Sequence, residues 1–285
     1  MRLFNKITII GVGLIGGSVA LAAKKKGVAG EIVGVFRHRS TLKKALKYKA
    51  VDRGTLDVRA GVKDADLIVL AAPVQQIPKL AREVTRYAKP GAIITDVGST
   101  KVWIVKVIED MVMSRPSVYF VGAHPMAGSE QQGVEHARHD LLEGAPCIVT
   151  KTGRTNARAL KSVILFWKSL GSKIKVMRPL EHDRAVSLIS HLPHIVAFSL
   201  AGSVPEGMLK FAAEGFRDTT RVASSDPRLW ADIFLTNKSE IVKAGKLFEK
   251  YYNKVIGAVL KGSYPATVRA LAAAKGKRDK FVYGK

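Results

Sequence analysis

Short apolar runs alternate with amphipathic stretches through the first 178 residues. The runs typical of buried strands are "KITII" (6–10), "EIVGVF" (31–36), "DLIVLAAP" (66–73), "AIITDV" (92–97), "SVYFVG" (117–122), "PCIVT" (146–150) and "KIKVM" (173–177). Helical periodicity occupies most of the intervals between them. Because such alternation builds a parallel sheet with helices on both faces, it predicts a doubly wound α/β domain over residues 1–178.

The strand pattern stops at Pro179. Residues 180–271 have the periodicity of helices, and their longest apolar stretch is "EHDRAVSLISHLPHIVAFSLAGS" (181–203). The sequence therefore predicts an all-α C-terminal domain over residues 179–285. By analogy with other two-domain proteins of this layout, that domain would supply a substrate pocket and a homodimer interface.

A glycine-rich segment, "GVGLIGG", follows the first apolar run directly and opens a helix. Gly11, Gly13 and Gly16 match the G-x-G-x-x-G spacing in the strand–turn–helix context that a Rossmann dinucleotide site requires. Gly11 would allow the tight turn, Gly13 the approach of a pyrophosphate to the backbone, and Gly16 the packing of helix on strand. The alternative is a glycine-rich turn without a ligand. Predicted cofactor contacts at this sheet edge also include Leu14, Ile15 and Pro73.

The second strand run ends in "GVFRHRS", with no acid between Val35 and Ser40. An acid there usually holds the ribose 2′-hydroxyl of NAD. The residues present, Arg37, His38, Arg39 and Ser40, would instead suit a 2′-phosphate, since guanidinium groups bind phosphate well. We therefore expect NADP as the preferred cofactor, with NAD possible. Solvated surface charges are the alternative interpretation.

The chain is strongly basic, with 47 Lys plus Arg against 23 Asp plus Glu and a formal net charge of +24. Such a charge raises nucleic acid as a partner and a non-enzymatic binding protein as a rival function. The basic residues are scattered, however, and no nucleic-acid-binding motif organises them, so we expect no nucleic acid partner. The single cysteine, Cys147, excludes an internal disulfide and a cysteine-rich metal site.

The uncharged run from Ile7 to Ala23 invites a membrane or secretory interpretation. It contains four glycines and falls short of the roughly 20 residues that span a bilayer. No other stretch looks long enough, so we expect a cytoplasmic protein with no membrane partner.

Two polar residues follow strand runs of the predicted sheet. His124, in "HPMAGSE", stands directly after the fifth run, where a neutral imidazole could accept a proton; a packing or capping histidine is the alternative. Ser99, in "DVGSTK", could bond that imidazole or a substrate hydroxyl, or could be the N-cap of the helix that follows.

The predicted helical domain contains the motif "SHLPH", with Ser190, His191 and His194. A spacing of three puts both histidines on one helix face, which raises a metal site, but no third ligand stands nearby and none is predicted. His182 and Asp183 could support a functional residue, or could cap a helix start.

Five motifs occur in an order that resembles the prephenate/arogenate dehydrogenase family of tyrosine biosynthesis, the cyclohexadienyl dehydrogenases. They are "GVGLIGGS", "DVGSTK", "GAHPMAGSE", "SHLPH" and "GFRDTTRVASSDPRLW". The resemblance spans essentially the whole chain. It implies an NAD(P)-dependent oxidoreductase that converts prephenate to 4-hydroxyphenylpyruvate and CO2. Arogenate oxidation to tyrosine, or another hydroxy-acid or imine reductase of this fold, stays open. The end at Lys285 is typical of the short, single-function form.

The resemblance also implies roles for particular residues. His124 would take the substrate hydroxyl proton with help from Ser99, and Arg221 would bind a substrate carboxylate, although Arg217 could replace it. His194 would lie near the side-chain carboxylate, which favours prephenate over arogenate. Asp218 would orient Arg221, or form only a surface pair, and Trp230 would be a pocket wall or a core residue. The predicted substrate contacts are Ser190, His191, His194, Asp218, Arg221 and Trp230.

Overall fold

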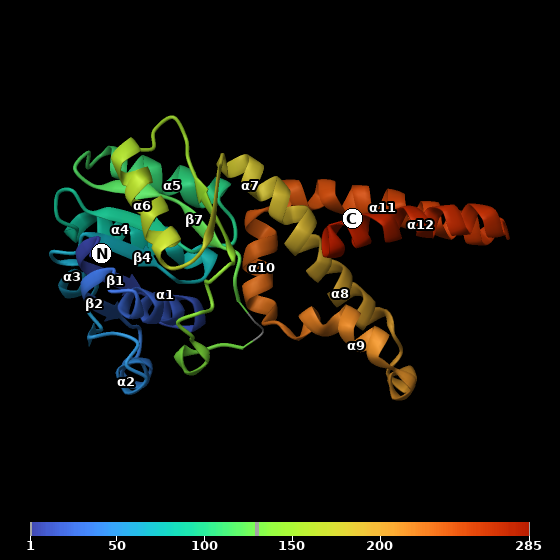
Figure 1. The fold of residues 1–285 in the computed structure, drawn as a ribbon, viewed down its shortest axis with the longest axis horizontal. Helices are drawn as coiled ribbons and strands as arrows, with labels where there is room; N and C mark the ends of the chain where they lie inside the picture. The colour runs from blue at the N-terminus through green and yellow to red at the C-terminus, as the bar shows by residue number, and fades with distance from the viewer. Residues whose placement is uncertain (1, 129–130, 285) are drawn as a thin grey trace. The chain divides into compact units, whose positions relative to one another are not determined.

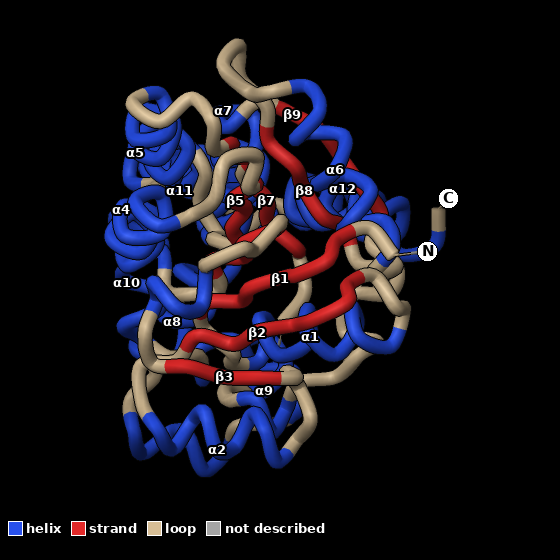
Figure 2. The backbone as a smooth tube through the Cα atoms, turned by 90° about the vertical axis from the view of Figure 1, so that its left-hand side faces the viewer, coloured by secondary structure: helices blue, strands red, loops and turns tan. Residues whose placement is uncertain are grey.

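The computed structural model describes residues 2–128 and 131–284. Its larger sheet is parallel throughout, with strand order β3-β2-β1-β4-β5-β6. The strands are β1 (Phe4–Ile10), β2 (Ala29–Val35), β3 (Arg53–Thr55), β4 (Leu67–Leu70), β5 (Ile93–Asp96) and β6 (Tyr119–Val121). Figure 2 shows β1, β2 and β3 running side by side. The order reverses between β1 and β4, and ligands of such sheets bind in the crevice that this reversal opens at the carboxyl ends of the strands.

Both faces of this sheet are buried. In β4, Leu67 and Val69 pack in one apolar core with α1 and α6, whereas Ile68 and Leu70 pack in a second core with α4 and α5. The predicted doubly wound α/β fold is therefore confirmed. The helices of this part are α1 (Leu14–Lys25), α2 (Arg39–Lys47), α3 (Val58–Val62), α4 (Ile77–Tyr87), α5 (Val102–Met113) and α6 (Ala157–Ser169), with 3-10 turns η1 (Val74–Gln76) and η2 (Val134–His136).

The last two predicted strands form a separate sheet with a short strand that the sequence did not reveal. Its order is β7-β8-β9, for β7 (Ala123–Pro125), β8 (Pro146–Thr150) and β9 (Lys173–Met177), and β7 runs antiparallel to β8. His124 was expected just after a strand but lies inside β7, opposite Ile148. Pairing with β8 fixes the backbone of His124 more firmly than a turn would.

The chain beyond Pro179 is helical, as predicted. Its elements are α7 (Pro179–Val186), the π-helical turn η3 (Ser187–His191), α8 (Leu192–Ser203), η4 (Glu206–Phe211), α9 (Glu214–Thr220), η5 (Arg221–Ser224), α10 (Pro227–Thr236), α11 (Lys238–Leu260) and α12 (Tyr264–Tyr283), most of them labelled in Figure 1. Two compact units divide the chain, residues 1–237 and residues 238–285. The first contains both sheets and the helices through α10, and the second is the hairpin of α11 and α12. The functional boundary between residues 178 and 179 stays a prediction.

One helical stretch, Pro179–Ser203, is long and apolar enough to cross a membrane. The expectation that no further stretch has that length is therefore wrong, because the π turn joins α7 and α8 into one continuous helix. Length and composition do not separate a membrane span from a helix that packs against protein. In this helix His182, Asp183 and His191 are buried inside the first unit.

Candidate active site

The turn between β1 and α1 has little room at two glycines and open space at the third. Gly11 has φ +92°, and a Cβ there would lie 2.2 Å from the carbonyl oxygen of Ala71. A Cβ at Gly16 would lie 2.1 Å from the carbonyl oxygen of Gly11, whereas one at Gly13 would meet nothing within 4 Å. The first turn of α1 has neither a capping side chain nor an acid. Its amides can therefore receive an anion in front of Gly13.

The other predicted cofactor residues stand along the same sheet edge. The amide of Gly11 donates to the carbonyl of Val35 over 3.1 Å, which joins the end of β2 to the glycine-rich turn. The exposed segment that follows β2 contains Arg37, His38, Arg39 and Ser40. Within the described ranges neither arginine of this segment forms an ion pair. Leu14 and Ile15 are half-buried at the start of α1, and Pro73 is exposed after β4. This edge fits a dinucleotide, with donors at the pyrophosphate position and cations beyond β2.

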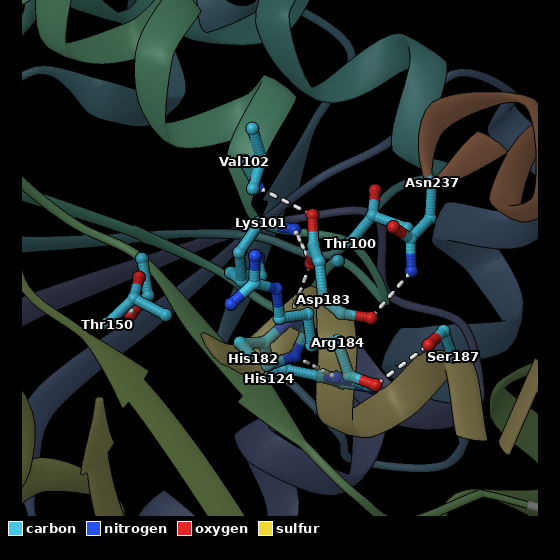
Figure 3. A network of polar contacts seen from close by, with 12 residues as sticks. Thr100, Lys101, Val102, His124, Thr150, His182, Asp183, Arg184, Ser187 and Asn237 are labelled. Carbon is cyan, nitrogen blue, oxygen red and sulfur yellow. Dashed lines mark hydrogen bonds and ion pairs between the residues drawn. The ribbon is translucent and has the colours of Figure 1, made fainter. Parts of the chain in front are cut away.

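The imidazole of His124 belongs to a buried relay of side chains. Its Nδ1 lies 2.8 Å from Nε2 of His182, and Nδ1 of His182 lies 2.7 Å from Oδ1 of Asp183. All three side chains are almost fully buried. Figure 3 shows the relay, with β7 supplying His124 and α7 supplying the other two residues.

The direction of the relay follows from its donors. The carboxylate of Asp183 accepts from the backbone amides of Lys101 and Val102, over 2.7 and 2.9 Å. As an acceptor it fixes the hydrogen of His182 on Nδ1, so Nε2 of His182 holds a lone pair. Nδ1 of His124 must then donate to that lone pair, which leaves Nε2 of His124 as the basic nitrogen. Within the described residues no hydrogen bond reaches this Nε2.

Burial keeps the relay histidines neutral. It lowers the pKa of His124 well below its usual value, and the positive charge of Lys101 and the neighbouring His182 and His191 act in the same direction. Burial likewise lowers the pKa of His182 well below its usual value. His124 is therefore unprotonated at neutral pH, as a proton acceptor must be.

A buried ion pair holds the backbone beside His124. Nζ of Lys101 is paired with Oδ2 of Asp96, and both side chains are fully buried. The other oxygen of Asp96 accepts from the amide of Ala123, the residue before His124, over 3.2 Å. The amide of Gly98 donates to Oδ2 over 2.8 Å. Sequence analysis missed this pair, although an acid at the end of the buried strand "IITD" was a signal for it.

Ser99 lies between β5 and α5 and is half-buried. The alternative that Ser99 caps the following helix is wrong, because α5 begins at Val102 and its first amides are bound by Asp183. Asp183 therefore has both of the roles considered for it. It supports its neighbour His182, and it caps α5, a helix that is remote from α7 in the sequence. No hydrogen bond joins Ser99 to His124 in the parts of the chain that the structure describes. The last two residues of "HPMAGSE", Ser129 and Glu130, lie outside those parts.

The two histidines of "SHLPH" have different environments. His191 is 1% exposed, and its Nδ1 accepts from the side-chain amide of Asn237 over 3.2 Å. Its hydrogen is therefore on Nε2, which is buried and has no partner among the described residues. Burial lowers the pKa of His191 to about 4. His194 is half-buried and stacks on Trp230, with ring centroids 3.5 Å apart and 24° between planes. Trp230 is itself buried in the second apolar core.

Arg221 lies at the start of η5, on the rim of an open cavity of about 430 Å³. Arg217 lines the same cavity, so the choice between the two arginines as anion ligand stays open. Arg221 is close enough to His194 to disfavour its charged form. Asp218 is exposed, and among the residues that the structure describes no ion pair links it to Arg221. Among the described residues no cluster of metal-ligating side chains occurs.

The doubly wound sheet has an anion-binding glycine turn, and a neutral, buried imidazole lies beside the carboxyl end of β5. Two arginines line a cavity in the helical part. These features together define a nicotinamide-dependent dehydrogenase. Two family models match the chain, the nucleotide-binding domain of prephenate dehydrogenase over residues 19–176 and its dimerization domain over residues 178–273. The chain belongs to the prephenate dehydrogenase family, whose members are NAD(P)-dependent oxidoreductases of tyrosine biosynthesis.

Individual relatives agree with the family models. The prephenate dehydrogenase of Bacillus subtilis is 36% identical over 282 residues, which cover 96% of this chain and 76% of the relative. The cyclohexadienyl dehydrogenase of Zymomonas mobilis is 34% identical, over 83% of this chain and 82% of the relative.

Solved structures give the same result. The prephenate dehydrogenase of Aquifex aeolicus, in complex with hydroxyphenyl propionate and NAD+, has a TM-score of 0.91 at 34% identity and covers 97% of this chain and 98% of its own. The arogenate dehydrogenase of Synechocystis has a TM-score of 0.83 at 31% identity, over 97% of this chain and all of its own.

Proposed function

We propose that this protein oxidises prephenate to 4-hydroxyphenylpyruvate and CO2 with NADP as the preferred hydride acceptor. The observation that carries the proposal is the relay that points the lone pair of His124 Nε2 away from His182, in a strand that is hydrogen-bonded to Asp96 at the carboxyl end of β5. An imidazole held in one tautomer, neutral and ready to accept a proton, suits the loss of the proton from the ring hydroxyl.

Residues of this chain move the proton and hold the reacting groups in place. When bound, the nicotinamide supplies the hydride acceptor. Nε2 of His124 takes the hydroxyl proton, and Asp183 compensates the positive charge that forms, through His182. Ser99, in the loop after β5, holds the same hydroxyl. The backbone of His124 is kept in place by Asp96, so that the base does not move as the substrate reacts.

The carboxylates of the substrate need permanent donors. We assign one of them to Arg221, whose guanidinium can form two parallel hydrogen bonds, with Arg217 on the same cavity as the alternative. The role of this arginine is positional, because binding the departing carboxylate more tightly than the transition state would slow the reaction. His191 adds a buried Nε2–H donor that has no partner within the described parts of the chain. The remaining proposed contacts are Ser190, His194, Asp218 and Trp230.

The preference for NADP rests on the exposed cations after β2. Arg37 and Arg39 have no ion pair within the described ranges, so both are available to a 2′-phosphate. The Aquifex relative was crystallised with NAD+, so NAD use is retained as the alternative. A double variant, Arg37→Ala with Arg39→Ala, should raise KM for NADP by about tenfold or more and leave KM for NAD nearly unchanged. An equal effect on both cofactors would contradict the assignment.

The helical part is proposed to form a homodimer. The matching family model is that of a dimerization domain, and apolar side chains such as Leu188 and Ile189 of η3 are 44% and 67% exposed. A second copy would cover such residues of Pro179–Ser203, which accounts for its apolar character without a membrane. We retain a cytoplasmic location and no nucleic acid partner as proposals. Sedimentation equilibrium would give the mass of one chain if the dimer were wrong.

The decisive experiment is a kinetic comparison of two substrates, prephenate and arogenate, each with NADP and with NAD. We expect turnover of prephenate with NADP at a higher kcat/KM than with NAD. A 3-hydroxy acid and a cyclic imine serve as control substrates for the alternative reductases. Turnover of either control, without turnover of prephenate or arogenate, would overturn the proposed function.

A further inference from the structure

The ring of His194 is held in one orientation and one tautomer. Its Nδ1 lies 2.9 Å from the carbonyl oxygen of Ser190. A carbonyl only accepts, so the single hydrogen of the neutral ring is on Nδ1 and Nε2 carries a lone pair. The stacking on Trp230 fixes the plane of the ring, and a flip would break the bond to Ser190. Within the described residues no hydrogen bond reaches Nε2 of His194.

The groups that face His194 keep it neutral near pH 7. They are Arg221 from η5, His191 from η3 and the uncharged indole of Trp230 from α10. Partial burial lowers the pKa of His194, the bond to Ser190 opposes that change, and the charge of Arg221 lowers the pKa further. His194 therefore presents an acceptor at neutral pH and becomes a donor only when it is protonated.

The two candidate substrates differ in what they can offer such a group. The pyruvyl side chain of prephenate ends in a ketone and a carboxylate, which are acceptors only. The side chain of arogenate carries an ammonium, which is a donor, beside the same carboxylate. A lone pair at Nε2 complements the ammonium and opposes the keto acid. Arg221 suits the carboxylate that both substrates share, so it does not discriminate between them.

We propose that Nε2 of His194 sets the choice between the two substrates through its protonation: the imidazolium selects prephenate, and the neutral imidazole selects arogenate. This inference rests on the proposed function and on placing the substrate side chain between His194 and Arg221. It also reverses an argument made from the sequence, in which His194 as a donor favoured prephenate. Near pH 7 the neutral ring gives arogenate the higher kcat/KM, and prephenate is oxidised with a lower one. The neutral ring is not a donor at Nε2, because Ser190 holds its hydrogen on Nδ1.

The test is the ratio of kcat/KM for prephenate to kcat/KM for arogenate, measured from pH 5.0 to 8.0 at saturating NADP, because the lowered pKa of His194 places its titration toward the acidic end of that range. The ratio is informative because titration of His124 affects both substrates equally and cancels. We expect the ratio to fall by about tenfold or more as pH rises through the pKa of His194. The reason is that the protonated ring donates a charge-assisted hydrogen bond to the side chain of prephenate, whereas the neutral ring sets one acceptor against another. The His194→Gln variant, which does not titrate, should show a ratio independent of pH.

The matched control is His136→Gln, a substitution at an exposed histidine of η2, which should keep the pH dependence of the original protein. A constant ratio in the original protein, with both substrates oxidised, would overturn the proposal and leave the proposed function intact. Oxidation of neither substrate would overturn both. Should His194→Gln fail to fold, nitrogen NMR of the histidine rings in the original protein shows which ring nitrogen of His194 carries the hydrogen. Hydrogen on Nδ1 of His194 above its pKa supports the proposal, and hydrogen on Nε2 overturns it.

Discussion

Nδ1 of His124 lies 2.8 Å from Nε2 of His182, although 58 residues separate the two along the chain. One of these nitrogens donates and the other accepts, and Asp183 decides which, because its carboxylate takes the hydrogen on Nδ1 of His182. Three side chains on two elements, His124 on β7 with His182 and Asp183 on α7, therefore form one unit. In it His124 is a buried, neutral proton acceptor that is held in a single tautomer.

Replacing His124 removes the proposed base. We expect His124→Asn to lower kcat by about 10² or more, because the substrate hydroxyl then loses its proton to no positioned group. The dissociation constant of NADP, measured by fluorescence quenching, should stay nearly unchanged, since the glycine turn and the residues after β2 are intact. His136→Asn is the matched control. A variant with full kcat would remove His124 from the chemistry.

Replacing Asp183 by its amide tests the direction of the relay. An amide at this position can donate to Nδ1 of His182, which would reverse both tautomers and turn the lone pair of His124 away from the substrate. Such an exchange in a similar relay costs up to about 10⁴ in kcat, and we expect a loss of about 10² or more for Asp183→Asn. Because Asp183 also caps α5, the thermal midpoint is measured in parallel. A loss of stability at unchanged kcat would show that Asp183 only supports the fold.

The buried pair of Lys101 and Asp96 gives a stability prediction. Lys101→Met leaves the carboxylate of Asp96 buried without its cation, and we expect the free energy of unfolding to fall by about 3–5 kcal/mol in urea titrations. The double variant with Asp96→Asn removes both charges and should recover much of that loss, since the amide oxygen can still accept from Gly98 or Ala123. Equal instability of the single and double variants would rule out the unpaired charge as the cause.

The buried histidines predict acid sensitivity. The pKa values of His124, His182 and His191 are lowered in the folded state, whereas in the unfolded chain they lie near 6.5. Below that pH the unfolded chain binds protons that the folded chain does not, so stability falls as pH falls. Each histidine contributes up to about 1.4 kcal/mol per pH unit, and for His191 the effect extends to about pH 4.

Urea titrations between pH 7.5 and 5.5 check this slope. The raised pKa values of Asp96 and Asp183 act in the opposite direction, so the contribution of one histidine is isolated by comparing the original protein with a single histidine variant. His191→Gln should give a shallower slope than the original protein. An equal slope in His191→Gln and in the original protein would contradict the neutral, buried state of His191.

The sequence revealed the strands that contain an apolar run and missed two short strands that do not. Seven strands were predicted because each is a run of apolar residues, such as Leu67–Leu70 in β4, long enough to show its pattern. The two that were missed, β3 and β7, have three residues each, "RGT" and "AHP". Neither is apolar enough to be recognised, and both form because a neighbouring strand offers unpaired backbone groups beside them.

The candidate site shows the same division. His124, Ser99 and the histidines of "SHLPH" could be found because their motifs are local. His182 and Asp183 were considered as a supporting pair, but the sequence did not show that they support His124, and it did not reveal Asp96. These residues reach His124 from elements that are remote in sequence.

The sequence by itself determined the glycine-rich turn, because a backbone at φ +92° favours glycine at position 11 whatever the rest of the chain does. Only the tertiary structure decided the protonation of the histidines. Burial removes the water that would stabilise a charged ring, and a carboxylate or a carbonyl brought from another position along the chain fixes which nitrogen holds the hydrogen. Those are properties of the surroundings of an imidazole, and the order of the residues does not contain them.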